Sequence, residues 1–306
     1  MSTPTPLITR RHLLAGAAAL PLMPSAVSAA APMLGVDSAP FRRVKLGAFE
    51  VTTLLAGTAV RPDPQSIFGM NASPEDFAAL SAQARLPIDQ AQFFFTPTVV
   101  NTGAQLVLFD TGLNAAGTTA ALEAAGYTTD MIDLVVITHM HGDHIGGLMN
   151  GDAPTFANAT YATGRVEFDA WAGMDNEKFE TSMRPVAEMT TMMEDGASGF
   201  AGHTAMAAFG HTPGHMVHII ESEGQSLVIA ADFANHYVWS LERPDWEVKF
   251  DMDKSAAAAT RRTLLDMMAT DGIPFVGYHM PWPGIGYVER HGGSYRYAAM
   301  SYQLML

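Results

Sequence analysis

The chain has 306 residues, of which 48% are hydrophobic and 16% charged, which is enough for one sizeable globular domain. Its 17 basic and 31 acidic residues give a formal net charge of −14, so the basic footprint of a nucleic-acid-binding protein is missing. We therefore expect neither nucleic acid nor an anionic membrane as a partner. The lack of cysteine excludes disulfides, thiolate metal ligands and a cysteine nucleophile.

The first thirty residues have the order of an export signal. Arg10 and Arg11 precede an apolar stretch at residues 13–23, and small residues follow at 26–31. The stretch is too short to span a bilayer comfortably, and the paired arginines resemble a twin-arginine signal that lacks the usual lysine. We expect residues 1–30 to direct export, residues 31–306 to form a single domain free of the membrane after signal removal, and the mature protein to be periplasmic or secreted.

Strand and helix patterns are interspersed along the rest of the chain. Strands are predicted from β-branched or continuously apolar runs at residues 49–60, 93–103, 104–112, 133–139, 216–222 and 225–232, the last two forming a hairpin around Glu223-Gly224. Helices are predicted at residues 115–126 and 254–272, each ending at a glycine. An α+β fold of two packed sheets with outer helices fits this order better than a single doubly wound sheet.

Metal-capable side chains are concentrated in the stretch THMHGDHIGG, residues 138–147. His139 and His141 are two positions apart, so on extended backbone both imidazoles point to one side and can reach one cation at about 2.0–2.1 Å. Asp143 and His144 are adjacent and diverge from that pair, which places them to serve a second cation. The loop therefore offers half of two neighbouring coordination spheres.

Further metal-capable residues occupy loop positions beside the predicted strands. The turn GHTPGH holds His211 and His215, Asp232 ends the run QSLVIAAD, and His279 follows IPFVGY. All of these positions can gather along one edge of a sandwich.

This constellation resembles the complete ligand set of the metallo-β-lactamase-fold hydrolases, which implies an αββα sandwich of two mixed sheets with a dinuclear metal site at the sheet edge. The resemblance implies two divalent cations per chain, zinc first, with cobalt, manganese and iron as alternatives. The implied ligands are His139, His141 and His215 for the first metal, Asp143, His144 and His279 for the second, and Asp232 as the bridge. Asp110 in LVLFDTG would support the ligands from behind, and His211 would have a turn or supporting role.

A hydroxide held between two cations is a nucleophile near neutral pH, and the cations also polarise a carbonyl or phosphoryl oxygen under attack. The residues expected to take part in catalysis are Asp232, which would fix the metal spacing and orient the hydroxide, and Asp143. Since metal-binding imidazoles must be neutral, activity should fall in acid.

Within the superfamily the sequence resembles methyl parathion hydrolase and its lactonase-like relatives, above all in the tail HMPWPGIGYVERHGGSYRY. The expected substrate is a small apolar, uncharged ester such as an organophosphate triester, a lactone or an aryl ester. Candidate pocket residues, each of which core packing would also explain, are Phe93, Phe95, Phe168, Trp171, Phe233 and Trp282. Asn235 stands where acyl-homoserine-lactone lactonases carry a tyrosine, which argues against a dedicated quorum-signal lactonase. Dimerisation rests on the resemblance alone.

Three other functions stay open. A β-lactamase lacks the bridging aspartate, so Asp232 argues against it, and a glyoxalase-type thioesterase usually adds a basic carboxy-terminal site, whereas this tail holds only Arg290 and Arg296 as basic residues. The non-enzymatic alternative is a metal-binding protein with a vestigial site. Four histidines have no motif support and are assigned to the surface or a hydrogen-bonded core, namely His203, His218, His236 and His291.

Overall fold

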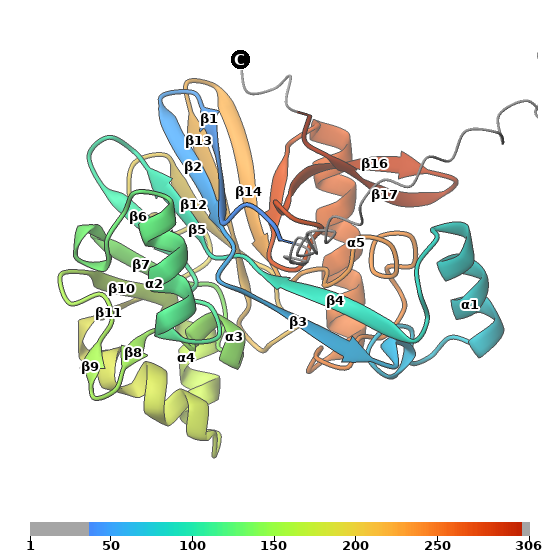
Figure 1. The fold of residues 1–306 in the computed structure, drawn as a ribbon, viewed down its shortest axis with the longest axis horizontal. Helices are drawn as coiled ribbons and strands as arrows, with labels where there is room; N and C mark the ends of the chain where they lie inside the picture. Colours follow the sequence, from blue (N-terminus) through green and yellow to red (C-terminus); the bar gives the residue numbers. More distant parts are fainter. Residues whose placement is uncertain (1–36, 302–306) are drawn as a thin grey trace, which may run out of the picture. The chain divides into compact units, whose positions relative to one another are not determined.

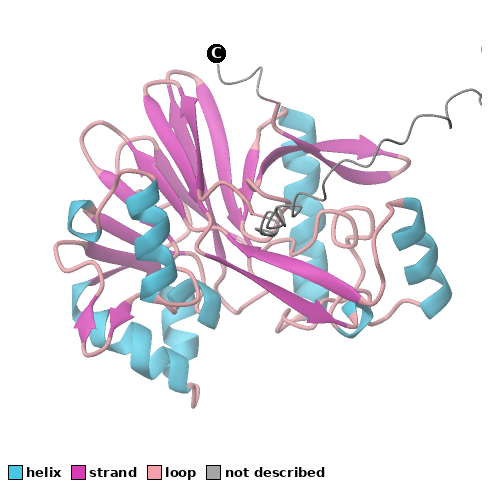
Figure 2. Cartoon of the chain, in the orientation of Figure 1, coloured by secondary structure: helices cyan, strands magenta, loops and turns pink. Residues whose placement is uncertain are grey.

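The computed structural model describes residues 37–301, so the predicted export signal at residues 1–30 lies outside the described residues. Within residues 37–301, a pair of sheets pack against each other, and helices cover their outer faces (Figures 1 and 2). The αββα sandwich expected from the sequence is confirmed. No helix between residues 37 and 301 is long and apolar enough to cross a membrane.

The first sheet is mixed and has seven strands. In spatial order they are β1 (Phe41–Leu46), β2 (Phe49–Leu54), β5 (Thr98–Asn101), β6 (Leu106–Phe109), β7 (Leu134–Ile137), β10 (Thr160–Gly164) and β11 (Thr190–Met193). Neighbours are antiparallel from β1 to β6 and parallel from β6 to β11. β7 reads LVVI and is buried throughout, as expected of a strand covered on both faces.

The second sheet has six strands, of which only β14 and β15 are parallel neighbours. In spatial order they are β12 (His203–Ala207), β13 (Met216–Ser222), β14 (Gln225–Ala231), β15 (Phe275–Gly277), β16 (Ile285–His291) and β17 (Ser294–Ala299). The predicted hairpin is confirmed, because β13 and β14 are joined by Glu223 and Gly224, both with positive φ. Residues that follow β14 and β15 leave the sheet at the same edge.

The core of the sandwich lies in three layers, and a further apolar cluster that includes Phe77 and Trp239 lies beside the β3–β4 hairpin. Apolar residues of the two inner faces, such as Val107, Val136 and Ile229, pack together between the sheets. Helices α2 (Ala115–Ala124) and α4 (Arg165–Ala172) bury Leu122 and Trp171 against the outer face of the first sheet.

Helix α5 (Lys254–Asp271) covers the outer face of the second sheet. The Asp253 side chain caps its start by accepting the Ala256 N–H (2.9 Å), and Gly272 ends it with φ +64°. The predicted helix and its buried face are confirmed: Leu264, Leu265 and Met268 are buried.

A hairpin of β3 (Gly57–Pro62) and β4 (Gln90–Phe95) pairs with neither main sheet and extends toward α1 (Pro74–Gln83) in Figure 1. The short elements of the remaining chain are η2 (Pro64–Ser66), η3 (Thr129–Met131), α3 (Gly142–Ile145), β8 (Met149–Asn150), β9 (Ala153–Pro154), the π-helical turn η4 (Phe179–Met183) and η5 (Arg184–Met189).

Two predicted strands are wrong as continuous elements. Residues 49–60 divide into β2 and β3, and residues 93–103 divide into β4 and β5. Pro97 cannot donate a ladder hydrogen bond, and its carbonyl instead accepts the Leu54 N–H (2.9 Å) at the point where the hairpin leaves the sheet. Apolar residues continue across the first break, at Leu55 and Ala56, so hydrophobicity alone does not show it, whereas Pro97 marks the second.

Candidate metal centre

Loops from both sheets converge at one edge of the sandwich. Residues 139–144 follow β7, Asp232 follows β14, His279 follows β15, and His211 precedes β13. The loop after β7 lies so close to the segment between β6 and α2 that a Cβ on Gly147 would be 2.0 Å from the Thr111 carbonyl oxygen. The glycines that end the stretch HGDHIGG are therefore needed for this close approach.

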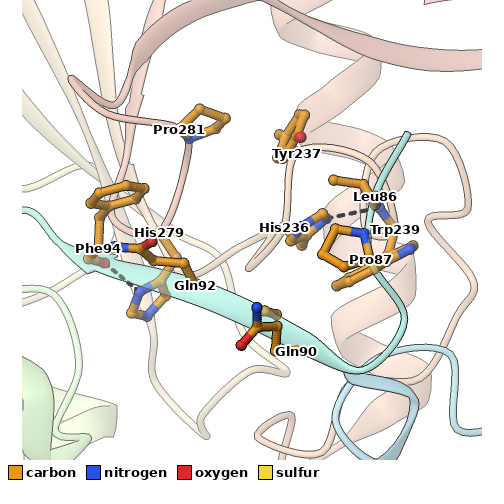
Figure 3. Close-up of a pocket in the computed structure, with 11 residues that line it drawn as sticks. Leu86, Pro87, Gln90, Gln92, Phe94, His236, Tyr237, Trp239, His279 and Pro281 are labelled. Atoms are coloured by element: carbon orange, nitrogen blue, oxygen red, sulfur yellow. Dashed lines mark hydrogen bonds between the residues drawn. The ribbon is translucent and has the colours of Figure 1, made fainter. Parts of the chain in front are cut away.

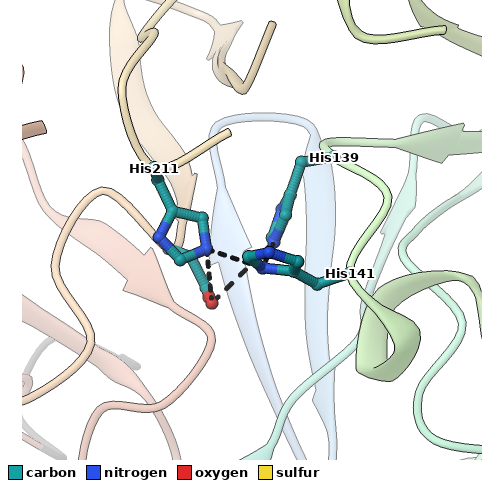
Figure 4. A group of neighbouring side chains, drawn as sticks. His139, His141 and His211 are labelled. Carbon is teal, nitrogen blue, oxygen red and sulfur yellow. Dashed lines mark hydrogen bonds and ion pairs between the residues drawn. The ribbon is translucent and has the colours of Figure 1, made fainter. Parts of the chain in front are cut away.

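The first group of metal-capable side chains comprises His139, His141, His211 and Asp232, with one candidate ligand atom from each lying within 4.8 Å of the others. Figure 4 shows the three imidazoles pointing toward one another. His141 Nδ1 lies 3.2 Å from His139 Nε2 and 3.0 Å from His211 Nε2. Burial lowers the pKa of His139 well below its usual value and that of His141 to about 3. Both rings are therefore neutral, which is the form that binds a cation.

The second group comprises Asp143, His144 and His279. Asp143 Oδ2 lies 3.3 Å from His279 Nε2 and 3.7 Å from His144 Nε2. Asp232 lies between the two groups: its Oδ1 is 3.5 Å from His144 Nε2, and its Oδ2 is 3.3 Å from His279 Nε2 and 3.4 Å from His211 Nε2. One buried carboxylate thus faces members of both groups.

The structure differs from the sequence assignment at the GHTPGH turn. His211, predicted to support the site, lies in the first group, whereas His215, predicted to be a ligand, does not. The Nε2 atom of His215 is already engaged, because it accepts the Asp232 backbone N–H (3.1 Å). Its carbonyl accepts the Ala208 N–H (2.9 Å), which fixes the residue in the sheet beneath the site.

The donor set fits divalent cations such as zinc, because it consists of imidazole nitrogens and carboxylate oxygens. Among the described residues, some buried side-chain nitrogen and oxygen atoms have no hydrogen-bond partner, and His144 Nε2 and Asp232 Oδ1 are two of them. A native interior seldom leaves such atoms unpaired unless a further group satisfies them.

Carboxylates and a carbonyl behind the site fix which ring nitrogen each histidine presents. Asp110 Oδ2 lies 2.8 Å from His144 Nδ1, and the Phe94 carbonyl accepts from His279 Nδ1 (2.8 Å). Asp251 Oδ1 likewise lies 2.8 Å from His211 Nδ1. With Nδ1 of each of these three rings engaged by its partner, Nε2 faces the site.

Asp110 adopts φ +60°, a conformation that costs energy for a residue with a side chain. Its carboxylate also accepts from the Thr138 N–H (2.9 Å), so it connects the end of β6 to the start of the histidine loop. The resemblance implied that Asp110 supports the metal ligands, and its contact with His144 Nδ1 is such a support.

Asp251 and Glu167 are supporting residues that sequence reasoning missed. Asp251 pairs with the fully buried Arg261 through Oδ2 (2.7 Å) as well as with His211. Glu167 has no exposed surface and accepts from Met140 N–H (2.9 Å), Gly214 N–H (2.8 Å) and Thr212 Oγ1 (2.8 Å). It therefore connects the loop of His139 and His141 to the turn of His211. Neither residue belongs to a sequence motif.

Replacing Glu167 with glutamine places an amide NH₂ against N–H donors. We expect this change to lower the free energy of unfolding by about 1–3 kcal/mol and metal affinity by roughly 10–100-fold, the usual effect of disturbing residues behind a metal site. Urea unfolding and competition with a chromophoric chelator measure the two effects. Glu194→Gln is the control, since Glu194 forms only an exposed pair with Arg165; equal metal affinity in both variants would contradict the prediction.

The pocket above the two groups has a volume of about 490 Å³. Its lining residues are Arg61, Phe93, Phe95, Leu113, His141, Gly142, Asp143, Lys178, Asp232, Phe250 and His279. The structure thus places Phe93 and Phe95 where the sequence predicted them. The rings of both make edge contacts with His279, at centroid distances of 5.4 and 5.5 Å. Sequence reasoning missed four other lining residues, Leu113, Phe250, Arg61 and Lys178.

The other predicted pocket aromatics lie elsewhere. Phe168 packs against Phe179, and Phe233 packs against Phe275 in the outer core. Trp171 is buried behind His141, with ring centroids 5.8 Å apart, and does not line the pocket. Trp282 lines a separate pocket beside β1. Core packing explains Phe168 and Phe233.

A second, smaller pocket of about 270 Å³ also reaches His279 (Figure 3). It is lined by Gln90, Gln92 and Phe94 of β4 and by Tyr237 and Trp239, among others. The dashed bond from His279 to Phe94 in Figure 3 joins the metal-capable ring to β4.

Three histidines without motif support are core residues. His203 Nε2 lies 2.9 Å from His218 Nδ1 between β12 and β13, and His236 Nδ1 accepts from the Trp239 N–H (3.2 Å). None of the three belongs to either metal-capable group.

Comparison with known proteins adds to this geometry. A sequence model of the Metallo-beta-lactamase superfamily matches residues 96–272, which is more than half of the chain. No curated protein matches the sequence. Among solved structures, the chain is similar to AidC, described as a dizinc quorum-quenching lactonase, with a TM-score of 0.80 and 22% identity over 86% of this chain and 98% of AidC.

Two further structures are similar. The hydrolase AbOPH of the β-lactamase superfamily has a TM-score of 0.73 and 24% identity, covering 87% of this chain and 99% of its own. A probable metal-dependent hydrolase from Staphylococcus aureus has a TM-score of 0.71 and 19% identity, covering 84% and 99%. At this level of identity the structural likeness shows the fold.

Proposed function

Since the chain belongs to the metallo-β-lactamase superfamily, we propose that this metal-dependent hydrolase binds two divalent cations per chain, zinc first, and cleaves uncharged carboxylic ester bonds, lactones and aryl esters above all. The observation that carries the proposal is the Asp232 carboxylate between two groups of imidazole and carboxylate ligands. The solved lactonase AidC, which is described as a dizinc enzyme, supports the metal and the bond type.

The residues that would hold the first cation are His139, His141 and His211, those that would hold the second are Asp143, His144 and His279, and Asp232 would be shared. When bound, divalent cations make water a nucleophile near neutral pH and polarise the carbonyl oxygen under attack.

The chain's own residues orient the ligands and the substrate. Asn235 Nδ2 donates to Asp232 Oδ2 (2.9 Å), which fixes the carboxylate plane. The Tyr278 hydroxyl donates to the Asp143 carbonyl (2.6 Å) and so holds the loop of the second group rather than facing substrate. Phe93 and Phe95 form an apolar wall beside His279 that excludes water from the acyl or aryl part of an ester.

The carboxy-terminal hairpin argues against the thioesterase alternative. Arg290 pairs with Asp266 (2.6 Å) and Arg296 with Glu289 (2.7 Å), so both basic residues of this tail are neutralised by neighbours. A glutathione carboxylate would have to compete with these pairs.

Removal of the metals tests the proposal. We expect dialysis against a chelator to abolish hydrolysis of a γ-lactone and an aryl ester, and to lower the melting temperature, because cations held at a thousandfold excess over Kd stabilise the folded state by about 4 kcal/mol. Zinc should restore both properties, and metal analysis should give two ions per chain. Full turnover by metal-free protein would refute the proposal, and a phosphotriester assayed in parallel compares the other ester class.

We also propose that residues 1–30 direct export of this hydrolase. The support is the order of paired arginines, apolar stretch and small residues. The mass of protein recovered from the periplasm should correspond to cleavage near residue 30; recovery of the full-length chain from the cytoplasm alone would contradict the proposal.

A further inference from the structure

Two basic side chains, those of Arg61 and Lys178, line the pocket above the metal-capable groups, although the whole chain carries a formal net charge of −14. Arg61 lies on β3, opposite Ala91 of β4. Lys178 directly precedes η4, and its Cγ would lie 3.6 Å from a Cβ placed on Gly142. The aliphatic part of Lys178 therefore covers the loop between His141 and Asp143. The two basic side chains reach the pocket from separate segments of the chain.

Neither the Arg61 nor the Lys178 side chain is neutralised by an acidic partner among the described residues of the chain. No hydrogen bond or ion pair joins the Arg61 or Lys178 side chain to another described residue, although Asp63, Glu177 and Glu180 are close in sequence. Glu180 pairs instead with Arg184 (2.7 Å). Elsewhere in this acidic chain, arginines such as Arg165, Arg261 and Arg296 have acidic partners. The two pocket cations are thus left available to a ligand.

The other lining residues show where Arg61 and Lys178 lie relative to the candidate metal site. Phe93, Phe95, Leu113 and Phe250 supply apolar surface, and Asp143, Asp232, His141 and His279 form the metal-capable floor. Two divalent cations held by these groups would outweigh the charges of Asp143 and Asp232, so the floor would then be positive as well. A cleft of one sign within low-dielectric walls attracts ligands of the opposite charge.

We propose that Arg61 and Lys178 bind an anionic group on the non-reacting end of the substrate, so that the preferred substrate is an ester or lactone carrying a carboxylate remote from the scissile bond. This inference rests on the proposed esterase or lactonase function and narrows its substrate class. The scissile bond is uncharged, the intervening acyl chain lies along the aromatic wall, and the distal carboxylate contacts the guanidinium and ammonium groups.

A matched pair of substrates tests the inference. Mono(4-nitrophenyl) adipate carries a free carboxylate, and methyl 4-nitrophenyl adipate has the same leaving group and chain without the charge. The zinc-loaded enzyme should favour the carboxylate by at least about tenfold in kcat/KM, mainly through KM, and the preference should fall as ionic strength rises. In the double variant Arg61→Gln/Lys178→Gln the ratio of the two kcat/KM values should fall to near one.

Lys45→Gln is the control for the loss of positive charge, because Lys45 lies on β1 and lines no part of this pocket; it should keep the wild-type ratio. A wild-type preference for the neutral ester, or an equal ratio in wild type and double variant, overturns the inference while leaving the esterase proposal intact. If neither ester is hydrolysed, the esterase proposal fails by itself. Calorimetry with monomethyl adipate then decides the inference: binding weakened about tenfold in the double variant supports it, and unchanged binding overturns it.

Discussion

Replacing His211 with alanine is expected to lower the metal content of the purified protein and to reduce kcat/KM by at least about 10²–10³-fold, the size of effect seen when a preorganised electrostatic group is removed from an active site. The reason is geometric: His211 Nε2 lies 3.0 Å from His141 Nδ1 and 3.4 Å from Asp232 Oδ2, within the first group. Metal analysis of the protein after gel filtration, together with steady-state kinetics on an aryl ester, measures both effects.

The matched variant is His215→Gln, four residues along the same turn. His215 Nε2 accepts the Asp232 N–H, and the Oε1 of glutamine, two bonds beyond Cγ like Nε2, can accept the same bond. We expect this variant to keep the wild-type metal stoichiometry while losing some stability. Loss of metal in His215→Gln with retention in His211→Ala would reverse the assignment and return His215 to the ligand set.

Replacing Asp251 with alanine is expected to lower the free energy of unfolding by about 3–5 kcal/mol, because it leaves a buried cation without its counter-charge. Arg261 is 1% exposed, and its guanidinium donates to Asp251 Oδ2 (2.7 Å) as well as to the carbonyls of Phe233 and Pro244. The same change removes the acceptor on His211 Nδ1, so metal affinity should fall by roughly 10–100-fold.

Urea unfolding with and without a chelator separates the two effects. The loss of stability caused by the unpaired Arg261 should persist in metal-free protein. The loss of stability caused by weaker metal binding at His211 should appear only when zinc is present. Asp245→Ala is the control, because the Asp245–Arg262 pair is exposed and such pairs contribute about 0–1 kcal/mol. An Asp251→Ala variant as stable as the control would show that the buried pair is not needed.

The sequence predicts best where local chemistry and local geometry coincide. The spacing of His139, His141, Asp143 and His144 is set by a single loop, and the caps and apolar face of α5 are contained in one segment. The choice between His211 and His215 needs more than local information. Both residues flank the same Pro-Gly turn, and the fold is needed to show that the His211 ring joins the first group while His215 Nε2 accepts the Asp232 N–H.

Residues that act across long sequence separations carry no local signal. Asp251 reaches His211 across 40 positions, and Glu167 reaches Met140 across 27. Arg61 and Lys178 are ordinary charged residues until the hairpin and the segment before η4 bring them to one pocket. The aromatic candidates show the converse: Phe168 and Phe233 resemble Phe93 and Phe95 in type, and only packing separates core from pocket.

The hydrogen bond from His279 to the Phe94 carbonyl has a mechanical consequence. Phe94 belongs to β4, whose only strand partner among the described residues is β3. Phe93 and Phe95 on the same strand form the pocket wall, so a bend of the hairpin that widened the entrance would also shift the acceptor that orients an imidazole. Access for a bulky molecule and the coordination angle at that ring are thereby coupled through one backbone carbonyl.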